Sequence, residues 1–229
     1  MIDLVVLDVA GTTVRDDGDV VARCMASVLA GANVQVDVAD VNPVMGLRKP
    51  LAIATLLESA RGGPPEPDEV ARIHDRFRAS MVEYYASSAD VAAMPGAETL
   101  FEGLRRRGVL IALDTGFDRT ILDAILDRLN WRSLLDATVA SDEVQRGRPH
   151  PDMIRSLTSR LGITDSARVC KVGDSIADIQ EGVNASCGLV VAIRNVRTHA
   201  VLDGSSSVAS IDHLDELLEH VDARSRVGA

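Results

Sequence analysis

The sequence has few of the features that mark secreted, membrane or zinc-binding proteins. Its three cysteines, Cys24, Cys170 and Cys187, are odd in number and far apart, which argues against a disulfide framework or a zinc site. No uncharged apolar run approaches the ~18 residues of a membrane helix. The first residues form neither a basic leader nor a cleavable apolar segment. We therefore expect a protein of the reducing cytoplasm that does not bind membranes.

Basic charge and aromatic side chains are also scarce. Lys and Arg total 24 against 34 Asp and Glu, so the formal net charge is -10. A surface of this sign repels polyanions, and the few scattered aromatic residues cannot build a base-stacking platform. Nucleic acid is therefore not an expected partner. With 46% hydrophobic residues among 229, the composition is typical of a globular protein with a substantial core.

Short aliphatic runs alternate with amphipathic segments along most of the chain. The runs lie at 2–9, 109–114, 137–140, 169–172, 189–193 and 208–211. The amphipathic segments lie at 97–107, 119–129, 151–161 and 175–183. This alternation predicts an α/β fold, with a Rossmann-like parallel sheet and helices on both of its faces.

One long stretch interrupts this alternation. Residues 18–91 show helical periodicity at 20–30, 50–59 and 67–85, and no strand pattern. We predict that they form a helical cap inserted after the first strand, with an α/β core built from residues 1–17 and 92–229. The two connections would act as hinges at the carboxyl end of the sheet. Residues 204–207 are expected to form a short loop.

Polar residues follow the first four predicted strands of the core. Asp8, Thr115 and Asp174 stand at strand ends, and Arg148 lies on the loop after the third strand. Taken singly, each has an ordinary structural explanation, such as capping a turn or a helix or lying on a solvated loop. Because ligands of open α/β sheets bind outside the carboxyl ends of the strands, the four side chains together predict one site.

The residue types in this set suit phosphoryl chemistry. Asp8 offers a carboxylate nucleophile, and the backbone N–H groups of the following Gly11 and Thr12 can cradle phosphoryl oxygens. The Thr115 hydroxyl can donate a hydrogen bond to such an oxygen. The Arg148 guanidinium, between a glycine and a proline, can clamp two of them.

A second carboxylate pair begins the helix predicted after the fourth strand. Asp174 and Asp178 are four residues apart, on one helix face. Asp174 beside Asp8 would form a hard oxygen site that suits Mg²⁺. Asp178 is expected either to hold a metal-bound water or to be a solvated helix acid.

Taken together, the four motifs resemble the haloacid dehalogenase-like hydrolase superfamily over essentially the whole chain. The resemblance implies that Asp8 is the nucleophile and that Mg²⁺ binds Asp8, the Ala10 carbonyl and Asp174. It also implies that Thr115 and Arg148 hold the phosphoryl group, with Arg148 where most relatives carry lysine. The substrate would be a small phosphorylated or phosphonate compound.

Position 10 departs from the usual phosphatase pattern. Ala10 stands where phosphatases of the superfamily have an acid that protonates the leaving group and activates water. The segment 44–49 resembles the cap motif of the phosphonatase-like (phosphonoacetaldehyde hydrolase-related) subgroup. By that resemblance Lys49 forms a Schiff base with the substrate aldehyde, provided its amine is neutral. Met45, Gly46 and Gly116 are then expected to bind substrate.

Other positions differ from phosphonatase itself. The chain has Val9 where phosphonatase has Trp, Ala52 where it has His and Phe117 where it has Tyr. These changes make the chain look like a phosphonatase-like sister group, whose members often pair through their caps, so a homodimer is one expectation. Two alternatives remain open: a phosphatase of a small metabolite such as a sugar phosphate, and a catalytically silent binding protein. Lys49 would then be a solvated lysine at a helix start.

Overall fold

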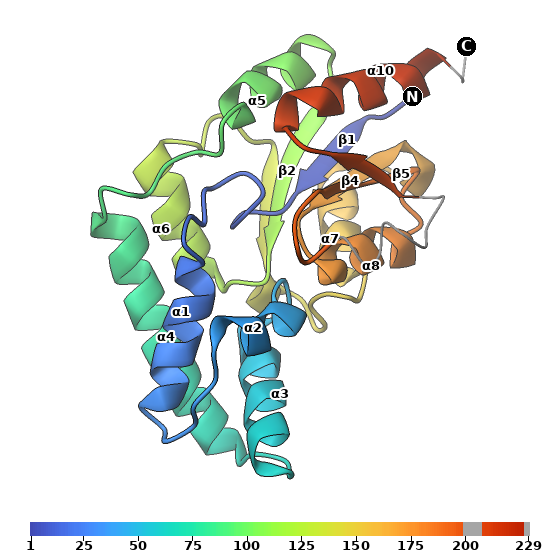
Figure 1. Cartoon of the computed structure of the whole chain (residues 1–229). Helices are drawn as coiled ribbons and strands as arrows, with labels where there is room; N and C mark the ends of the chain where they lie inside the picture. Colours follow the sequence, from blue (N-terminus) through green and yellow to red (C-terminus); the bar gives the residue numbers. More distant parts are fainter. Residues whose placement is uncertain (199–207, 227–229) are drawn as a thin grey trace.

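The computed structural model describes residues 1–198 and 208–226, so the loop expected at 204–207 lies outside the described residues. Six parallel strands form one sheet in the order β3-β2-β1-β4-β5-β6 (Figure 1). The strands are β1 (Leu4–Leu7), β2 (Leu110–Thr115), β3 (Ala137–Ala140), β4 (Val169–Gly173), β5 (Leu189–Ile193) and β6 (Ala209–Ile211). The predicted α/β fold class is confirmed.

Helices cover both faces of the sheet. They are α5 (Ala97–Arg106), α6 (Arg119–Leu129), α7 (Asp152–Leu161), α8 (Ile176–Asn184) and α10 (Leu217–Arg226). Along β1, Val5 and Leu7 belong to the hydrophobic cluster that includes α5, α6 and α10, whereas Leu4 and Val6 pack with α7. Because both faces of β1 are buried, the strand is aliphatic throughout. No helix among the described residues is long and apolar enough to cross a membrane.

Four helices lie together beyond the carboxyl end of the sheet, in the lower part of Figure 1. They are α1 (Val20–Ala30), α2 (Val38–Val41), α3 (Lys49–Arg61) and α4 (Pro67–Ser87), and a short 3-10 turn, η1 (Asn42–Val44), follows α2. Helix α4 packs against α1 and α3 and also against α6. The insertion therefore contacts the α/β part through α6. The division at residues 18–91 stays a prediction.

The sequence pattern missed one piece of this insertion. Helix α2 begins with a reciprocal capping box between Asp37 and Asp40, yet it is four residues long, which is too short to show helical periodicity. Helix α3 starts at Lys49, one residue earlier than the periodicity indicates, because Pro50 suits the first turn of a helix. The loop between η1 and α3 therefore ends just before Lys49.

The two connections to the insertion run side by side. Met94 N donates to Thr13 O at 2.8 Å, and Arg15 N donates to Ala92 O at 3.1 Å. This pairing brings the start and the end of the insertion together next to the strand end that carries Asp8.

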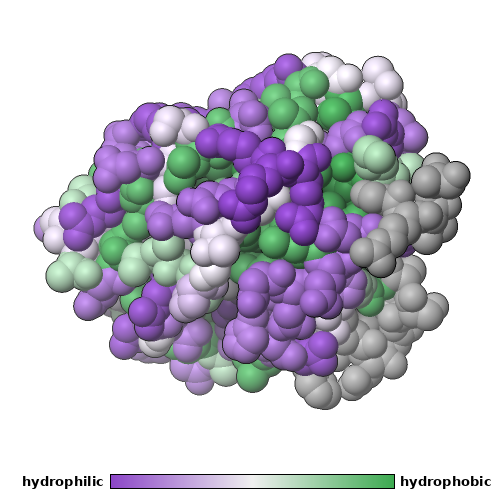
Figure 2. Space-filling model, turned by 90° about the horizontal axis from the view of Figure 1, so that it is seen from above, coloured by the Kyte–Doolittle hydropathy of each residue, from purple (hydrophilic) through white to green (hydrophobic). Residues whose placement is uncertain are grey.

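The face of the molecule drawn in Figure 2 is largely hydrophilic. Figure 2 shows hydrophilic residues over much of the face seen from above, with hydrophobic ones scattered among them. Scattered apolar side chains of this kind are normal on folded proteins.

Candidate active site

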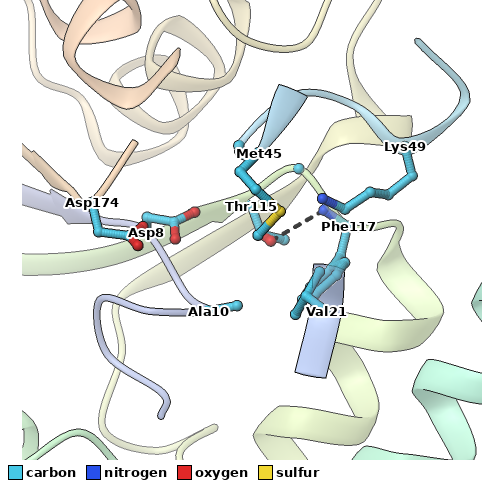
Figure 3. A pocket seen from close by; sticks show the side chains of 10 residues that line it. Asp8, Ala10, Val21, Met45, Lys49, Thr115, Phe117 and Asp174 are labelled. Atoms are coloured by element: carbon cyan, nitrogen blue, oxygen red, sulfur yellow. Dashed lines mark hydrogen bonds between the residues drawn. The ribbon is translucent and has the colours of Figure 1, made fainter. Parts of the chain in front are cut away.

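A small pocket lies between the carboxyl end of the sheet and the helical insertion. It has a volume of about 20 Å³, which is room for a single water molecule. Its lining residues are Asp8, Ala10, Val21, Met45, Gly46, Lys49, Thr115, Gly116, Phe117 and Asp174 (Figure 3). The structure thus brings together eight of the twelve residues predicted for the site. The other four, Gly11, Thr12, Arg148 and Asp178, do not line the pocket.

The loop before α3 is seated directly on the α/β part of the chain. A Cβ atom at Gly116 would lie 2.6 Å from Leu47 O and 2.7 Å from Gly46 O. A Cβ atom at Gly46 would lie 2.2 Å from Ser175 Oγ. Gly116 thus lets main chain from the two parts meet directly, and Gly46 leaves room for the Ser175 side chain. The pocket holds about one water molecule, so a substrate of several atoms would require its lining to move.

We expect Gly116→Ala to lower kcat/KM by about 10²-fold, because displacing the loop by about 1 Å misplaces Lys49 relative to Asp8. Steady-state kinetics and a melting curve measure the effect. Gly63→Ala is the matched control, since nothing lies within 4 Å of a Cβ atom there. Equal kinetics for the two variants would show that this close approach has no functional role.

Arg148 is fully buried and aimed at carboxylates. Its Nε donates to Glu181 Oε2 at 2.9 Å, and Nη1 donates to Asp8 Oδ1 at 2.5 Å and lies 3.0 Å from Asp178 Oδ1. Its Nη2 donates to the carbonyl of Asp114 at 3.0 Å and to the carboxylate of the same residue. In this arrangement the guanidinium orients the Asp8 carboxylate. The expected clamp on phosphoryl oxygens stays a prediction.

A second buried cation, Lys171, completes this network and was not singled out from the sequence. Its Nζ lies 3.1 Å from Asp178 Oδ1 and 3.4 Å from Glu181 Oε2, and it donates to Asp114. Burial alone would lower the pKa of Lys171, but these three carboxylates hold it above its usual range. The three carboxylates therefore favour the charged form of Lys171.

The same network bears on where a metal would bind. Carboxylate oxygens of Asp8, Asp114 and Asp178 lie within 4.8 Å of one another, close enough to hold an ion. Arg148 and Lys171, however, already ion-pair with all three groups. We therefore treat this cluster as a protein-internal ion network that positions Asp8.

We expect Lys171→Met to destabilise the fold by about 3–5 kcal/mol, because it leaves buried carboxylates without their counter-charge. Chemical denaturation measures the change. The control is Arg61→Met, which breaks an exposed pair with Glu69 and should leave stability nearly unchanged. A Lys171→Met protein as stable as the control would mean that the network carries no such dependence.

Asp8 and Asp174 form the remaining pair of acids. Both line the pocket, and their carboxyl groups lie close to one another in Figure 3. Burial and the nearby Asp178 charge raise the pKa of Asp8 to about 7, against the effect of Arg148. Burial also raises the pKa of Asp174. Two crowded carboxylates beside the main chain of Ala10 are hard oxygen donors, and this set fits Mg²⁺.

Asp174 is held from several directions. Thr12 Oγ1 donates to its Oδ1 at 3.4 Å, and Asn195 Nδ2 donates to its main-chain O at 2.9 Å. Arg197 Nη2 donates to its Oδ2. A Cβ atom at Gly11, where φ is +90°, would lie 2.4 Å from that same oxygen. Asn195 and Arg197 lie on the loop after β5 and were not found from the sequence.

The two hydroxyl positions predicted near the phosphoryl group differ in exposure to the pocket. Thr115 lines it, and its Oγ1 accepts a hydrogen bond from Phe117 N at 3.1 Å, drawn as the dashed line in Figure 3. The Thr12 hydroxyl instead faces Asp174. Asp178 does not line the pocket but is fully buried and caps α8 with Ser175, so the alternative of a solvated helix acid is wrong.

Lys49 is a buried amine inside the pocket. It is 4% exposed, and its Nζ lies 5.2 Å from the ring centroid of Phe117 and 6.0 Å from that of Phe77. Burial lowers the pKa of Lys49 to about 8, although the Asp8 carboxylate opposes this. The alternative of a solvated lysine is therefore wrong. The sequence contains only one other lysine, Lys171, whose pKa shifts the opposite way.

Comparisons with known proteins agree with this geometry. A family model described as haloacid dehalogenase-like hydrolase matches residues 2–186. A protein of Bordetella pertussis named phosphonoacetaldehyde hydrolase is 30% identical over 194 residues, covering 80% of this chain and 70% of the relative. One of Pseudomonas fluorescens with the same name is 27% identical over 247 residues, covering 93% and 89%.

Solved structures share the fold. The crystal structure of a phosphonoacetaldehyde hydrolase-like protein from Oleispira antarctica has a TM-score of 0.81 at 22% identity, covering 100% of this chain and 95% of that one. The structure of CbbY from Rhodobacter sphaeroides in complex with phosphate has a TM-score of 0.73 at 21% identity, covering 95% and 96%.

Proposed function

The chain belongs to the haloacid dehalogenase-like hydrolases, and from this premise we propose that it cleaves the P–C bond of a small phosphonate aldehyde, with Lys49 as the amine and Asp8 as the phosphoryl acceptor. The family and the phosphonatase-like relatives make it a phosphohydrolase. The observation that carries the finer proposal is the buried amine of Lys49, with a pKa of about 8, in one small pocket with Asp8.

The proposed reaction balances with these residues. The neutral amine of Lys49 adds to the aldehyde, and with the uptake of one proton from solvent and the loss of water this gives a protonated imine. The imine accepts the electron pair of the breaking P–C bond, while an oxygen of Asp8 forms a bond to phosphorus. Water then hydrolyses the acyl phosphate to free phosphate and Asp8. Protonation and hydrolysis of the remaining enamine release the aldehyde and restore Lys49.

Ala10 suits this reaction. A phosphate ester leaves an alkoxide that must be protonated, whereas a carbon leaving group next to an imine stores its electrons in the enamine. A proton donor at position 10 is therefore not required for P–C cleavage.

Hydrolases of this family generally use Mg²⁺. Here Asp8, Asp174 and the carbonyl of Ala10 would hold the ion, which would neutralise charge on the phosphoryl oxygens. The Thr115 hydroxyl would donate to one of those oxygens. Arg148 would keep the attacking carboxylate of Asp8 in place through its hydrogen bond at 2.5 Å.

Reductive trapping tests the proposal. Borohydride added with phosphonoacetaldehyde should attach a two-carbon group to one lysine, and peptide mass spectrometry should locate it on Lys49. Lys171 is an internal control because it is the only other lysine and remains charged. An adduct on Lys171, or no adduct on either lysine, would contradict the imine mechanism.

A second candidate, hydrolysis of a phosphate ester, is favoured by one residue. Burial raises the pKa of Asp16 to about 6, and its Oδ1 accepts a hydrogen bond at 3.1 Å from Val21 N, next to the pocket. Asp16 would then supply the acid that Ala10 lacks. This function predicts that phosphate is released faster from sugar phosphates than from phosphonoacetaldehyde. It also predicts that Asp16→Asn slows release from the sugar phosphates.

A further inference from the structure

We propose that Arg197 is a built-in counter-ion of Asp174 that competes with the divalent cation, so that metal binding displaces its guanidinium toward acids at the entry to the insertion. The inference rests on the metal site of the proposed function. It concerns a residue of this chain that lies beyond the family match, which ends at residue 186.

The first observation is the contact itself. Arg197 Nη2 donates to Asp174 Oδ2, and the side chains of these two residues are only 12% and 5% exposed. The same Nη2 lies 3.3 Å from the place of a Cβ atom on Gly11, the residue after Ala10. The guanidinium therefore lies beside the groups that would coordinate the metal. A unit positive charge a few ångströms from a divalent cation in a buried site opposes its binding.

The second observation is that a structured loop places Arg197 there. Asn195 Oδ1 accepts hydrogen bonds from Arg197 N at 2.7 Å and from Thr198 N at 3.1 Å. Asn195 Nδ2 donates to Asp174 O at 2.9 Å, and Thr198 Oγ1 donates to Ile193 O at 2.8 Å. The loop is thus anchored to the end of β5 and to Asp174, so the contact is part of the architecture.

The third observation is that other acids lie within reach of the Arg197 guanidinium. Its Nη1 lies 3.9 Å from Asp19 Oδ1, and Asp19 is the residue before α1. Asp16 on the same connection also interacts electrostatically with Arg197. The Nε of Arg197 is buried and has no hydrogen-bond partner within the described part of the chain. Displacement from Asp174 would therefore move the charge from the α/β part onto the entry to the insertion, coupling metal binding to the position of the cap.

Calorimetric titration with Mg²⁺ tests the competition without relying on activity. We expect Arg197→Gln to bind Mg²⁺ about tenfold more tightly than the wild type, within the range of couplings between neighbouring sites. Arg197→Lys keeps the charge and should stay near the wild-type affinity. Arg194→Gln is the matched control, because Arg194 lies on the same loop but pairs with exposed Asp212. Unchanged or weaker binding by Arg197→Gln overturns the proposal.

Hydrogen exchange of the wild type provides a second measurement that needs no variant. Saturating Mg²⁺ should speed exchange of the amides of Arg197 and Thr198, because release of the guanidinium loosens the loop that Asn195 closes. Slower or unchanged exchange contradicts the displacement. If the wild type and every variant bind no Mg²⁺, the proposed metal site itself fails. If all bind it with equal affinity, only the role of Arg197 fails.

Discussion

Asp8→Asn should reduce phosphate release by at least about 10³-fold, on phosphonoacetaldehyde and on acetyl phosphate alike. The amide keeps the shape of the side chain but removes the charge that attacks phosphorus, and losses of this size are typical when a covalent nucleophile is replaced. The measurement is a phosphate-release assay with Mg²⁺, together with a melting curve that confirms folding.

Asp142→Asn is a suitable control, since this acid is exposed and lies outside the pocket. Activity of Asp8→Asn within tenfold of the wild type would mean that another group accepts the phosphoryl group. A wild type that binds Mg²⁺ but releases phosphate from no compound would instead identify the chain as a catalytically silent relative.

Lys49→Met should abolish cleavage of phosphonoacetaldehyde, by about 10³-fold or more, but leave hydrolysis of acetyl phosphate largely intact. Only the first reaction needs an imine, whereas both need Asp8. Comparing the two substrates on one variant therefore separates loss of the amine from general damage to the pocket. Equal losses on both substrates would show that Lys49 acts in phosphoryl transfer or folding and not through an imine.

The pH dependence of the wild type follows from the same residue. The attacking amine must be neutral, and a group with a pKa of about 8 is about one-tenth neutral at pH 7 and mostly neutral at pH 9. The rate on phosphonoacetaldehyde should thus rise through about pH 8 and then level. Asp8 must lose its proton for both substrates, so the ratio of the two rates isolates the limb due to Lys49. A ratio of the two rates that does not change with pH would contradict a role for the Lys49 amine in the reaction.

Much of the fold could be predicted because it depends on local patterns. Parallel strands buried on both faces are aliphatic throughout, and β5 (Leu189–Ile193) lies where its aliphatic run predicts. Helices α1 (Val20–Ala30) and α6 (Arg119–Leu129) match their periodic segments residue for residue. Short elements such as α2 are too short to show helical periodicity, and their capping residues, such as Asp37, are also common in turns.

The site was predictable only in part. Asp8, Thr115 and Asp174 stand at strand ends, and the strand ends of a parallel sheet meet at one edge, so the proximity of these residues could be inferred. Lys171 and Glu181 were not predicted as parts of the site. Both are charged residues that the structure buries completely, and Lys171 interrupts the aliphatic run of β4, which is the only hint that the sequence gives of either. Arg197 offered none, because an arginine on a loop after the fifth strand looks like any solvated arginine until the fold brings it onto Asp174.

The sequence by itself determined the class of sheet, the helical insertion and the acids at the strand ends, because hydropathy and its periodicity are properties of neighbouring residues. The tertiary structure alone decided the direction in which the pKa of each buried lysine shifts. Lys49 and Lys171 are both buried lysines, yet the first lies beside two aromatic rings and the second among three carboxylates. Desolvation disfavours the ammonium in the first case, and opposite charges hold it in the second. Those neighbours come from distant parts of the chain, and only folding brings them together.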